Sequence, residues 1–126
     1  CVSREDIDLL VTSLGKHPVG GILASPGRET LKRTDAQGNI LATVDRRLLW
    51  QAATPQMFRY QTLREALALS AADRHPVTDE ASAVEYWMAK NQDMRGIQVI
   101  KGRPDNIKIT FAEDLVLAAK ILSETF

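Results

Sequence analysis

The chain has 126 residues, enough for one modest domain with a core, and its 44% hydrophobic and 25% charged content is ordinary for a globular protein. Sixteen basic and sixteen acidic side chains cancel, which excludes a general electrostatic attraction to nucleic acid or membranes. The single cysteine and two histidines exclude an internal disulfide and a metal centre rich in these residues. With no apolar run of about 18 residues, we expect a soluble, cytoplasmic protein without a membrane partner.

The first half of the sequence predicts a helix, a buried strand and a hairpin. Ser3 with Asp6 reads as a variant capping box, and an apolar stripe follows at helical spacing, formed by Ile7, Leu10, Val11 and Leu14. The apolar run 19–24 suits a buried strand. Residues 31–33 and 40–44 predict the arms of a basic hairpin, because Asp, Gly and Asn between them favour a turn. The apolar segment that follows, 48–58, is irregular.

The second half predicts three helices and two short strands. Capping boxes open the first helix at 62–65 and the last at 110–113, and Thr78 precedes the middle helix. The last helix has a shared face formed by Leu115, Ala118, Ala119 and Leu122. Strands are expected at 96–102 and 106–110. Because strands alternate with helices, the predicted fold class is α/β, although the strands are too few to form a nucleotide crevice alone.

Hydroxyl and basic side chains are the candidate site residues. A guanidinium binds two phosphate oxygens, a lysine adds a mobile charge, and a threonine adds a short donor, so the combination suits a phosphate ester. The candidates are Thr30, Lys32, Arg33, Arg46, Arg47, Thr54, Thr78 and Lys108. Taken singly, the hairpin arginines also read as solvated charges, Thr78 as a helix cap and Lys108 as an outward strand residue. Spacing alone therefore defines no site.

Five segments in one order, from Thr30 to Ala118, resemble a known family. They are "ETLKR", "TVDR", "LWQAATPQMF", "TDEASAVE" and "GRPDNIKIT", the last followed by "AEDL". Together they resemble the C-terminal half of the 2-C-methyl-D-erythritol 4-phosphate cytidylyltransferase family. The resemblance implies a Rossmann-like nucleotidyltransferase domain with a protruding β-hairpin arm, here at about 27–48. It also implies a homodimer interlocked through these arms, and a reaction of CTP with methylerythritol phosphate that uses Mg²⁺ and releases pyrophosphate.

The resemblance assigns roles position by position. Arg46 and Lys108 match catalytic residues that position the substrate phosphate, and Thr30 matches an arm threonine that contacts the same substrate. Thr54 and Thr78 match threonines that line or support this site. Fixed cations at these positions would reduce the repulsion between an anionic phosphate and an anionic triphosphate.

The resemblance also implies missing parts. The glycine-rich loop, its lysine and the aspartate that holds Mg²⁺ are expected upstream of Cys1, so no metal ligand is assigned within this chain. We therefore expect residues 1–126 to be the C-terminal portion of a single cytidylyltransferase domain, inactive without its nucleotide-binding half. Residues 88–96 form a longer link than usual and receive no role.

Two alternatives remain at this point. A ribitol-phosphate cytidylyltransferase shares the nucleotide chemistry and much of this pattern. A non-catalytic module would use the basic hairpin for dimerisation or RNA binding, although the hairpin offers no aromatic side chain on which a base could stack.

Overall fold

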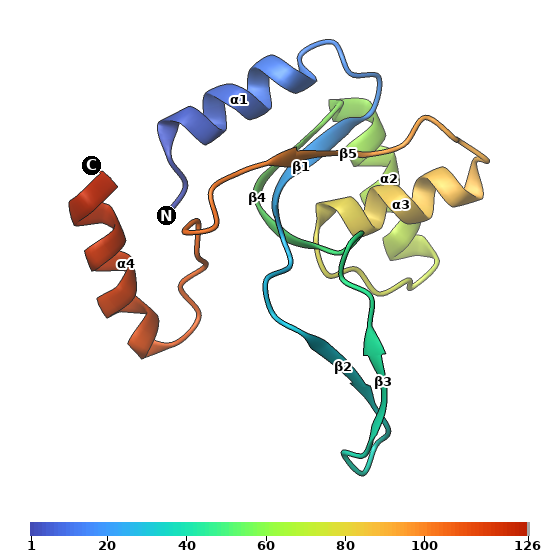
Figure 1. The fold of residues 1–126 in the computed structure, drawn as a ribbon. Coiled ribbons are helices and arrows are strands. Elements are labelled where there is room, and N and C mark those ends of the chain that lie inside the picture. The colour runs from blue at the N-terminus through green and yellow to red at the C-terminus, as the bar shows by residue number, and fades with distance from the viewer. Residues whose placement is uncertain (126) are drawn as a thin grey trace.

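A three-stranded mixed sheet organises the molecule, and a two-stranded hairpin extends away from it (Figure 1). The computed structural model describes residues 1–125. In chain order the elements are α1 (Arg4–Leu14), β1 (Gly20–Pro26), β2 (Leu31–Thr34), β3 (Ile40–Val44), β4 (Trp50–Phe58), α2 (Tyr60–Ala72), α3 (Glu80–Lys90), β5 (Gln98–Lys101) and α4 (Ala112–Thr125). The predicted α/β class is confirmed.

The sheet has the order β4-β1-β5, with β1 antiparallel to β4 and parallel to β5. The buried run from Gly20 to Ala24 makes β1 the central strand, as predicted for residues 19–24. The start of β1 lies so close to the two neighbouring strands that no side chain fits there. A Cβ on Gly20 would lie 2.2 Å from the Met57 carbonyl oxygen, and a Cβ on Gly21 would lie 2.2 Å from the Gln98 carbonyl oxygen. These two glycines therefore allow both neighbours to pair with β1.

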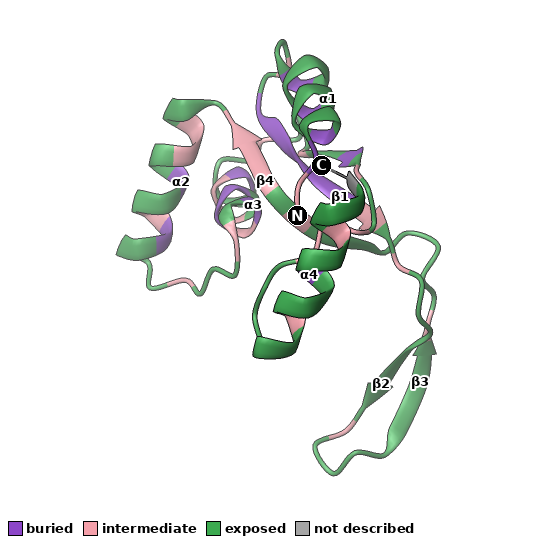
Figure 2. Ribbon diagram, turned by 90° about the vertical axis from the view of Figure 1, so that its left-hand side faces the viewer, coloured by how far each residue is buried: buried purple, intermediate pink, exposed green. Residues whose placement is uncertain are grey.

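The hydrophobic core lies on both faces of this sheet (Figure 2). Alternate residues of a strand point to opposite faces. Accordingly, Leu23 packs with Leu10 and Leu14 of α1, whereas Ile22 and Ala24 pack on the other side with Ala81 of α3 and, in part, Phe58. The helices α2 and α3 complete that second side around Val19, Ala66 and Val84.

Helix α1 begins as predicted but turns a different face to the sheet. The Ser3 hydroxyl accepts a hydrogen bond from the Asp6 amide at 3.1 Å, which confirms the N-cap. The reciprocal half of the capping box is wrong, because the Asp6 carboxylate accepts from the Arg103 amide instead. The stripe is half wrong: Leu10 and Leu14 are buried, whereas Ile7 and Val11 are 39% and 52% exposed. The buried face includes the polar residues Ser3 and Asp6, which the apolar pattern ignores.

Two strand expectations need correction. The segment 48–58, expected to be irregular, contains β4 (Trp50–Phe58), because it pairs along the buried β1. Residues 106–110, expected to be a strand, have no strand conformation. Within the described residues the sheet ends at β5, so the alternation of "NIKIT" has no partner strand to pair with.

Three helix starts also differ from the predicted ones. Helix α2 begins at Tyr60, before the predicted box at 62–65, and has no side-chain cap. Helix α3 is capped by Asp79 rather than by Thr78, in a capping box with Ser82. Before α4, the Asp114 carboxylate accepts from the amides of Thr110 and Phe111 at 2.9 Å, so the acid that binds the helix start is not the predicted Glu113. Of the predicted face of α4, Leu115, Ala119 and Leu122 are exposed and Ala118 is buried.

The predicted hairpin is present, and it projects from the sheet with little cover (Figure 1). Its arms pair antiparallel from Leu31 opposite Val44 to Thr34 opposite Ile40. At the tip, the Asp35 carboxylate accepts from the amides of Gln37 and Asn39, both at 2.9 Å. Apolar hairpin side chains remain exposed, Ile40 by 65% and Leu41 by 62%.

Among the described residues, none of the helices has both the length and the apolar character needed to cross a bilayer.

Candidate functional site

A cavity of about 490 Å³ with a mixed polar and apolar lining lies where β4, the start of α3 and the loop after β5 meet. It brings together three of the predicted site residues, Thr54, Thr78 and Lys108, from segments far apart in the sequence. The full lining is Ala52, Ala53, Thr54, Gln56, Thr78, Asp79, Glu80, Asn106, Ile107 and Lys108. We call this space the phosphate cavity, after the chemistry that its side chains suit.

The β4 wall carries Thr54 and Gln56, which are two residues apart along an extended strand. The peptide bond between Thr54 and Pro55 is cis. Gln56 uses both ends of its amide: Nε2 donates to Asp79 Oδ2 at 3.0 Å, and Oε1 accepts from the Ala81 amide at 2.9 Å. This wall is thereby bound directly to the start of α3.

The α3 wall is built by a capping box. Asp79 Oδ1 accepts from the Ser82 amide at 2.8 Å, and the Ser82 hydroxyl accepts from the amides of Asp79 and Thr78 at 3.2 and 3.0 Å. Asp79 thus takes the capping role that the sequence offered to Thr78. The Thr78 side chain is not needed for the cap, and it lines the cavity.

The third wall is the loop from Gly102 to Lys108. The Gly102 amide donates to the Ala24 carbonyl at 2.9 Å, and the Arg103 amide donates to the buried Asp6 carboxylate at 2.8 Å. Farther along, Asn106 Nδ2 donates to the Thr54 carbonyl at 2.8 Å. Lys108 follows two residues later on the exposed rim.

The arrangement suits an anion with hydroxyl groups. The Lys108 ammonium and the hydroxyls of Thr54 and Thr78 are donors of the kind that bind a phosphate ester. The carboxylates of Asp79 and Glu80 offer acceptors to hydroxyl groups on the same molecule. Together they fit the phosphate of a polyol better than a molecule that is anionic throughout.

The Mg²⁺ that the resemblance implies does not fit these residues. Among residues 1–125, no group of three or more His, Cys, Asp or Glu side chains is placed to hold a metal ion. The lining of the cavity holds two acidic side chains, Asp79 and Glu80.

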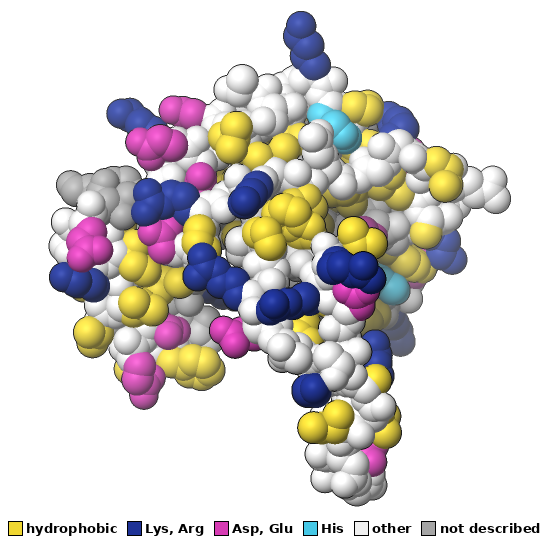
Figure 3. Space-filling model, viewed as in Figure 1, with side chains coloured by type: hydrophobic (Ala, Val, Ile, Leu, Met, Phe, Trp, Pro, Cys, Tyr) yellow, Lys and Arg dark blue, Asp and Glu magenta, His cyan; other side chains and the backbone are white. Residues whose placement is uncertain are grey.

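Thr30 and Arg46 are not brought to the phosphate cavity. Thr30 is exposed where the chain enters β2, and Arg46 follows β3, where its Nη1 donates to the Arg28 carbonyl. Neither residue lines the cavity of its own chain. Basic side chains gather on the face between α4 and the base of the hairpin (Figure 3). A contribution from the hairpin to this cavity would therefore need a second subunit.

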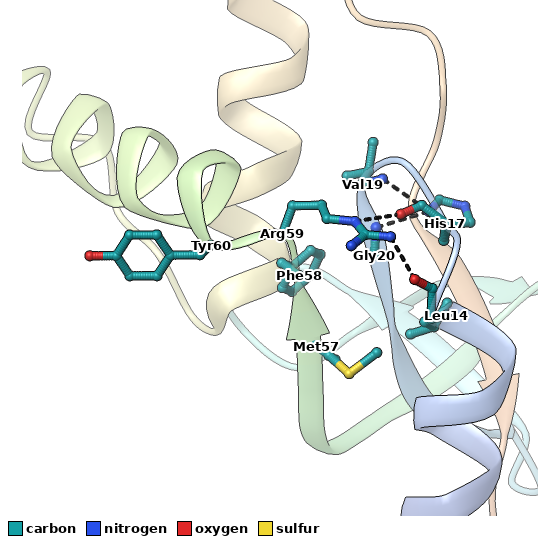
Figure 4. Close-up of a pocket in the computed structure, with 9 residues that line it drawn as sticks. Leu14, His17, Val19, Gly20, Met57, Phe58, Arg59 and Tyr60 are labelled. Carbon is teal, nitrogen blue, oxygen red and sulfur yellow. Dashed lines mark hydrogen bonds between the residues drawn. The ribbon is translucent and has the colours of Figure 1, made fainter.

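A second hollow of about 210 Å³ lies between the end of α1 and the start of α2 (Figure 4). Arg59 donates from Nη2 to the Gly15 carbonyl and from Nε to the His17 carbonyl, both at 2.8 Å. His17 Nδ1 accepts from the amides of Val19 and Gly20 at 3.1 and 2.9 Å. These side chains satisfy backbone groups of the loop before β1, so their role is structural.

The matching family model is described as "IspD: 2-C-methyl-D-erythritol 4-phosphate cytidylyltransferase", and it covers residues 1–124. The chain belongs to this family. It is 51% identical to the enzyme of that name from Pseudomonas syringae pv. tomato over 90% of this chain and 46% of that protein. It is 48% identical to that from Shewanella frigidimarina over 98% of this chain and 51% of that protein. It thus spans about half the length of the curated relatives that it matches.

A solved structure gives the same family. The crystal structure of the Francisella tularensis enzyme, IspD, is 34% identical and superposes with a TM-score of 0.78, covering 95% of this chain and 54% of that one. The family expected from the five segments is confirmed, as is the nucleotidyltransferase fold. The alternative of a ribitol-phosphate cytidylyltransferase is not favoured.

The RNA-binding alternative is likewise not favoured by the family match, and two basic side chains of the hairpin have partners within it. Arg47 forms a salt bridge with Asp45 at 2.5 Å, which lowers the pKa of that carboxyl and raises the pKa of the guanidinium. Lys32 Nζ donates to the Thr43 hydroxyl at 2.7 Å. Two basic side chains of the hairpin therefore have partners within the hairpin.

The sequence interpretation missed Gln56, Asp79 and Asn106 as members of the cavity wall. Two of them had a usable signal. Gln56 is two residues after Thr54, and Asn106 is two residues before Lys108, so each amide lies close in sequence to a predicted site residue. Amides carry no charge, so a pattern of phosphate-binding cations does not include them.

Proposed function

We propose that this chain supplies the alditol-phosphate side of a cytidylyltransferase about twice its length. The substrates are CTP and 2-C-methyl-D-erythritol 4-phosphate, and the products are 4-diphosphocytidyl-2-C-methyl-D-erythritol and pyrophosphate. The observation that carries the proposal is the meeting of Thr54, Thr78 and Lys108 in one cavity of an IspD-family chain. We place CTP and Mg²⁺ on residues outside this chain, because its described residues offer no metal site.

In this reaction an oxygen of the alditol phosphate attacks the α-phosphorus of CTP. A new P–O bond forms, the bond from the α-phosphorus to the bridging oxygen of the β-phosphate breaks, and pyrophosphate leaves with that electron pair. Lys108 holds the attacking phosphate through its ammonium, and Thr54 and Thr78 fix the angle of that phosphate by hydrogen bonding. Catalysis by such residues consists of positioning and charge stabilisation.

We place Thr30 and Arg46 in the cavity of a second subunit. The hairpin is exposed on both arms, carries apolar side chains with no cover in this chain, and holds Thr30 and Arg46 away from their own cavity. A homodimer in which each hairpin packs against the other subunit would bury those apolar residues. It would also add a guanidinium to each phosphate cavity. We place this enzyme in the cytoplasm.

The test is pyrophosphate release by the full-length protein with CTP, Mg²⁺ and either methylerythritol phosphate or ribitol phosphate. We expect release with methylerythritol phosphate, and a loss of at least about 100-fold in Lys108→Ala, as for the loss of a group that stabilises transition-state charge. The control is Lys120→Ala, since Lys120 forms a salt bridge with Glu124 on α4, outside the cavity. Release only with ribitol phosphate would contradict the proposed substrate, and silence with both would contradict the proposed reaction.

The hairpin assignment needs a different measurement. An inactive Lys108→Ala protein mixed with an inactive Arg46→Ala protein should regain activity, because subunit exchange yields one cavity with both cations. No recovery after exchange would show that Arg46 acts in its own subunit or not at all.

A further inference from the structure

Two amide side chains hold the phosphate cavity together, and neither has a charge or hydroxyl suited to the chemistry. Gln56 links β4 to the start of α3 through two hydrogen bonds, to Asp79 Oδ2 at 3.0 Å and from the Ala81 amide at 2.9 Å. Only one orientation of its amide serves both partners, because Asp79 presents an acceptor and Ala81 a donor. The link is therefore specific to glutamine.

Asn106 makes the corresponding link on the opposite wall. Its Nδ2 donates to the carbonyl oxygen of Thr54 at 2.8 Å, across 52 positions of sequence. The loop that carries Asn106 is also bound at its start, where the Arg103 amide donates to Asp6. The Asn106 link is placed two residues before Lys108, and so it limits how far the Lys108 backbone can move from Thr54.

Both links converge on the short segment from Thr54 to Gln56. Gln56 sets the distance from this segment to Thr78, and Asn106 sets the distance to Lys108. We propose that Gln56 and Asn106 are positioning residues that hold the alditol phosphate's binding groups in register. This inference rests on the proposed function and extends it to residues that touch the reacting phosphate only through others.

The physical reason is the sensitivity of group transfer to geometry. A displacement of about 1 Å in a positioning group reduces rates by about 100-fold. The three walls come from separate elements, and the cavity between them is open to solvent. Without the side-chain links, each wall would keep its own fold while the spacing between walls relaxed.

The experiment measures kcat and both KM values of the full-length enzyme for Gln56→Met and Asn106→Ala. We expect the KM for methylerythritol phosphate to rise at least about fivefold and kcat to fall, with the KM for CTP within twofold of the parent value. A purely structural role would reduce the active fraction, which lowers kcat and leaves both KM values unchanged. The split between the two KM values therefore separates positioning from loss of folded protein.

The chain contains a matched control for each change. Gln61 Nε2 donates to Glu65 at 2.9 Å on exposed α2, and Asn91 Nδ2 donates to the Trp87 carbonyl at 2.8 Å at the end of α3. Both are local amide contacts outside the phosphate cavity. Gln61→Met and Asn91→Ala should leave all three constants unchanged.

A further variant separates the two hydrogen bonds of Gln56. Gln56→Glu keeps an acceptor for the Ala81 amide and sets a second carboxylate against Asp79. At a pH at which both carboxylates are ionised, we expect a higher KM for methylerythritol phosphate than in Gln56→Met, because the like charges repel. At lower pH the two groups can share a proton, which restores a donor to Asp79, so this KM should fall towards the parent value.

The outcomes are distinct. An active parent whose Gln56 and Asn106 variants keep the parental KM for methylerythritol phosphate overturns the positioning roles and leaves the proposed function intact. A parent that is silent with every alditol phosphate overturns the proposed function, and the positioning roles with it.

Discussion

The predicted site residues lie in two regions that are held in opposite ways. Thr54, Thr78 and Lys108 lie on walls bound to one another by long-range hydrogen bonds, one of which spans 52 positions. Thr30 and Arg46 lie on or beside a hairpin whose side-chain hydrogen bonds fall within residues 28–47. The sheet region holds its own geometry, whereas the hairpin can acquire a fixed position only from something that packs against it.

Burial shows the same contrast (Figure 2). The central strand β1 is buried from Gly20 to Ala24, whereas all four residues of β2 are exposed. A substitution in the sheet therefore acts on the stability of the fold. A similar substitution in the hairpin should act on what the hairpin contacts.

The largest expected effect compares two glycines with positive φ. Gly20, at φ +134°, has no room for a Cβ, which would lie 2.2 Å from the Met57 carbonyl oxygen, whereas Gly38 at the hairpin tip, at φ +87°, has open space. Gly20→Ala should lower the free energy of unfolding by about 4 kcal/mol or more, and Gly38→Ala by about 1 to 2 kcal/mol. Guanidinium unfolding curves measure both. Equal effects would contradict the contrast between the regions.

The next effect compares two leucines. Leu23 is 0% exposed in the core against α1, and Leu41 in the hairpin is 62% exposed. Leu23→Ala should cost about 3 kcal/mol of unfolding free energy by loss of burial and creation of a cavity. Leu41→Ala should leave the unfolding of the monomer unchanged and weaken self-association, measured by analytical ultracentrifugation. If Leu41→Ala destabilised the monomer as strongly, the hairpin would have to pack on its own chain.

A smaller effect concerns the anchor of the Lys108 loop. Asp6 is buried and accepts from the Arg103 amide at 2.8 Å, so Asp6→Ala leaves that amide without its acceptor. We expect the free energy of unfolding to fall by about 2 kcal/mol, the cost of an unsatisfied buried donor. Asp8→Ala on the exposed side of the same helix is the control and should change stability by less than about 0.5 kcal/mol. Hydrogen exchange at the Arg103 amide should increase in Asp6→Ala alone.

The smallest effect concerns a type of Arg–Asp salt bridge that occurs once in each region. Arg95 pairs with Asp93 at 2.6 Å after α3, as Arg47 pairs with Asp45 beside the hairpin. The hydrogen bond from Arg95 lowers the pKa of Asp93 to about 2, from an ordinary 3.8. Because the folded pKa is lowered, the associated stability is present above pH 4 and is lost as the pH falls towards 2. An NMR titration of the carboxyl carbon measures this pKa.

In Arg95→Ala the pKa of Asp93 should return towards 3.8, with little change in global stability because the Arg95 side chain is half exposed to solvent. Arg47→Ala should raise the pKa of Asp45 in the same way. A pair made by residues two positions apart needs no tertiary structure, so it should behave alike in both regions. Different behaviour would mean that the body of the protein contributes to the Asp93 pair.

Local sequence signals located most elements but misplaced several of their ends. The run 19–24, the hairpin and the existence of the helices follow from apolar periodicity and turn residues. The cap of α3 was assigned to Thr78 because either Thr78 or Asp79 can serve chemically, and only the geometry of the Ser82 amide selects Asp79. The strand β4 was missed because its regularity comes from pairing with β1, which no local pattern reports.

The candidate site could likewise be predicted only in part from the sequence. The residue types that bind a phosphate, and the family, could be inferred from ordered segments of sequence. The sequence could not show that Thr54, Thr78 and Lys108 meet while Thr30 and Arg46 lie elsewhere, because that separation depends on how the sheet and the hairpin diverge after Pro26.

Side-chain types and their order along the chain are enough to define the local chemistry of this protein: its apolar runs, its turns, its phosphate-binding side chains and the family to which they belong. These are properties of neighbouring residues, and they are fixed by side-chain type and spacing. The tertiary structure alone decided which residues share a cavity and which amides link its walls. Those facts depend on contacts between segments 23 to 97 positions apart, as from Gln56 to Asp79 and from Asp6 to Arg103, which form only when the sheet assembles.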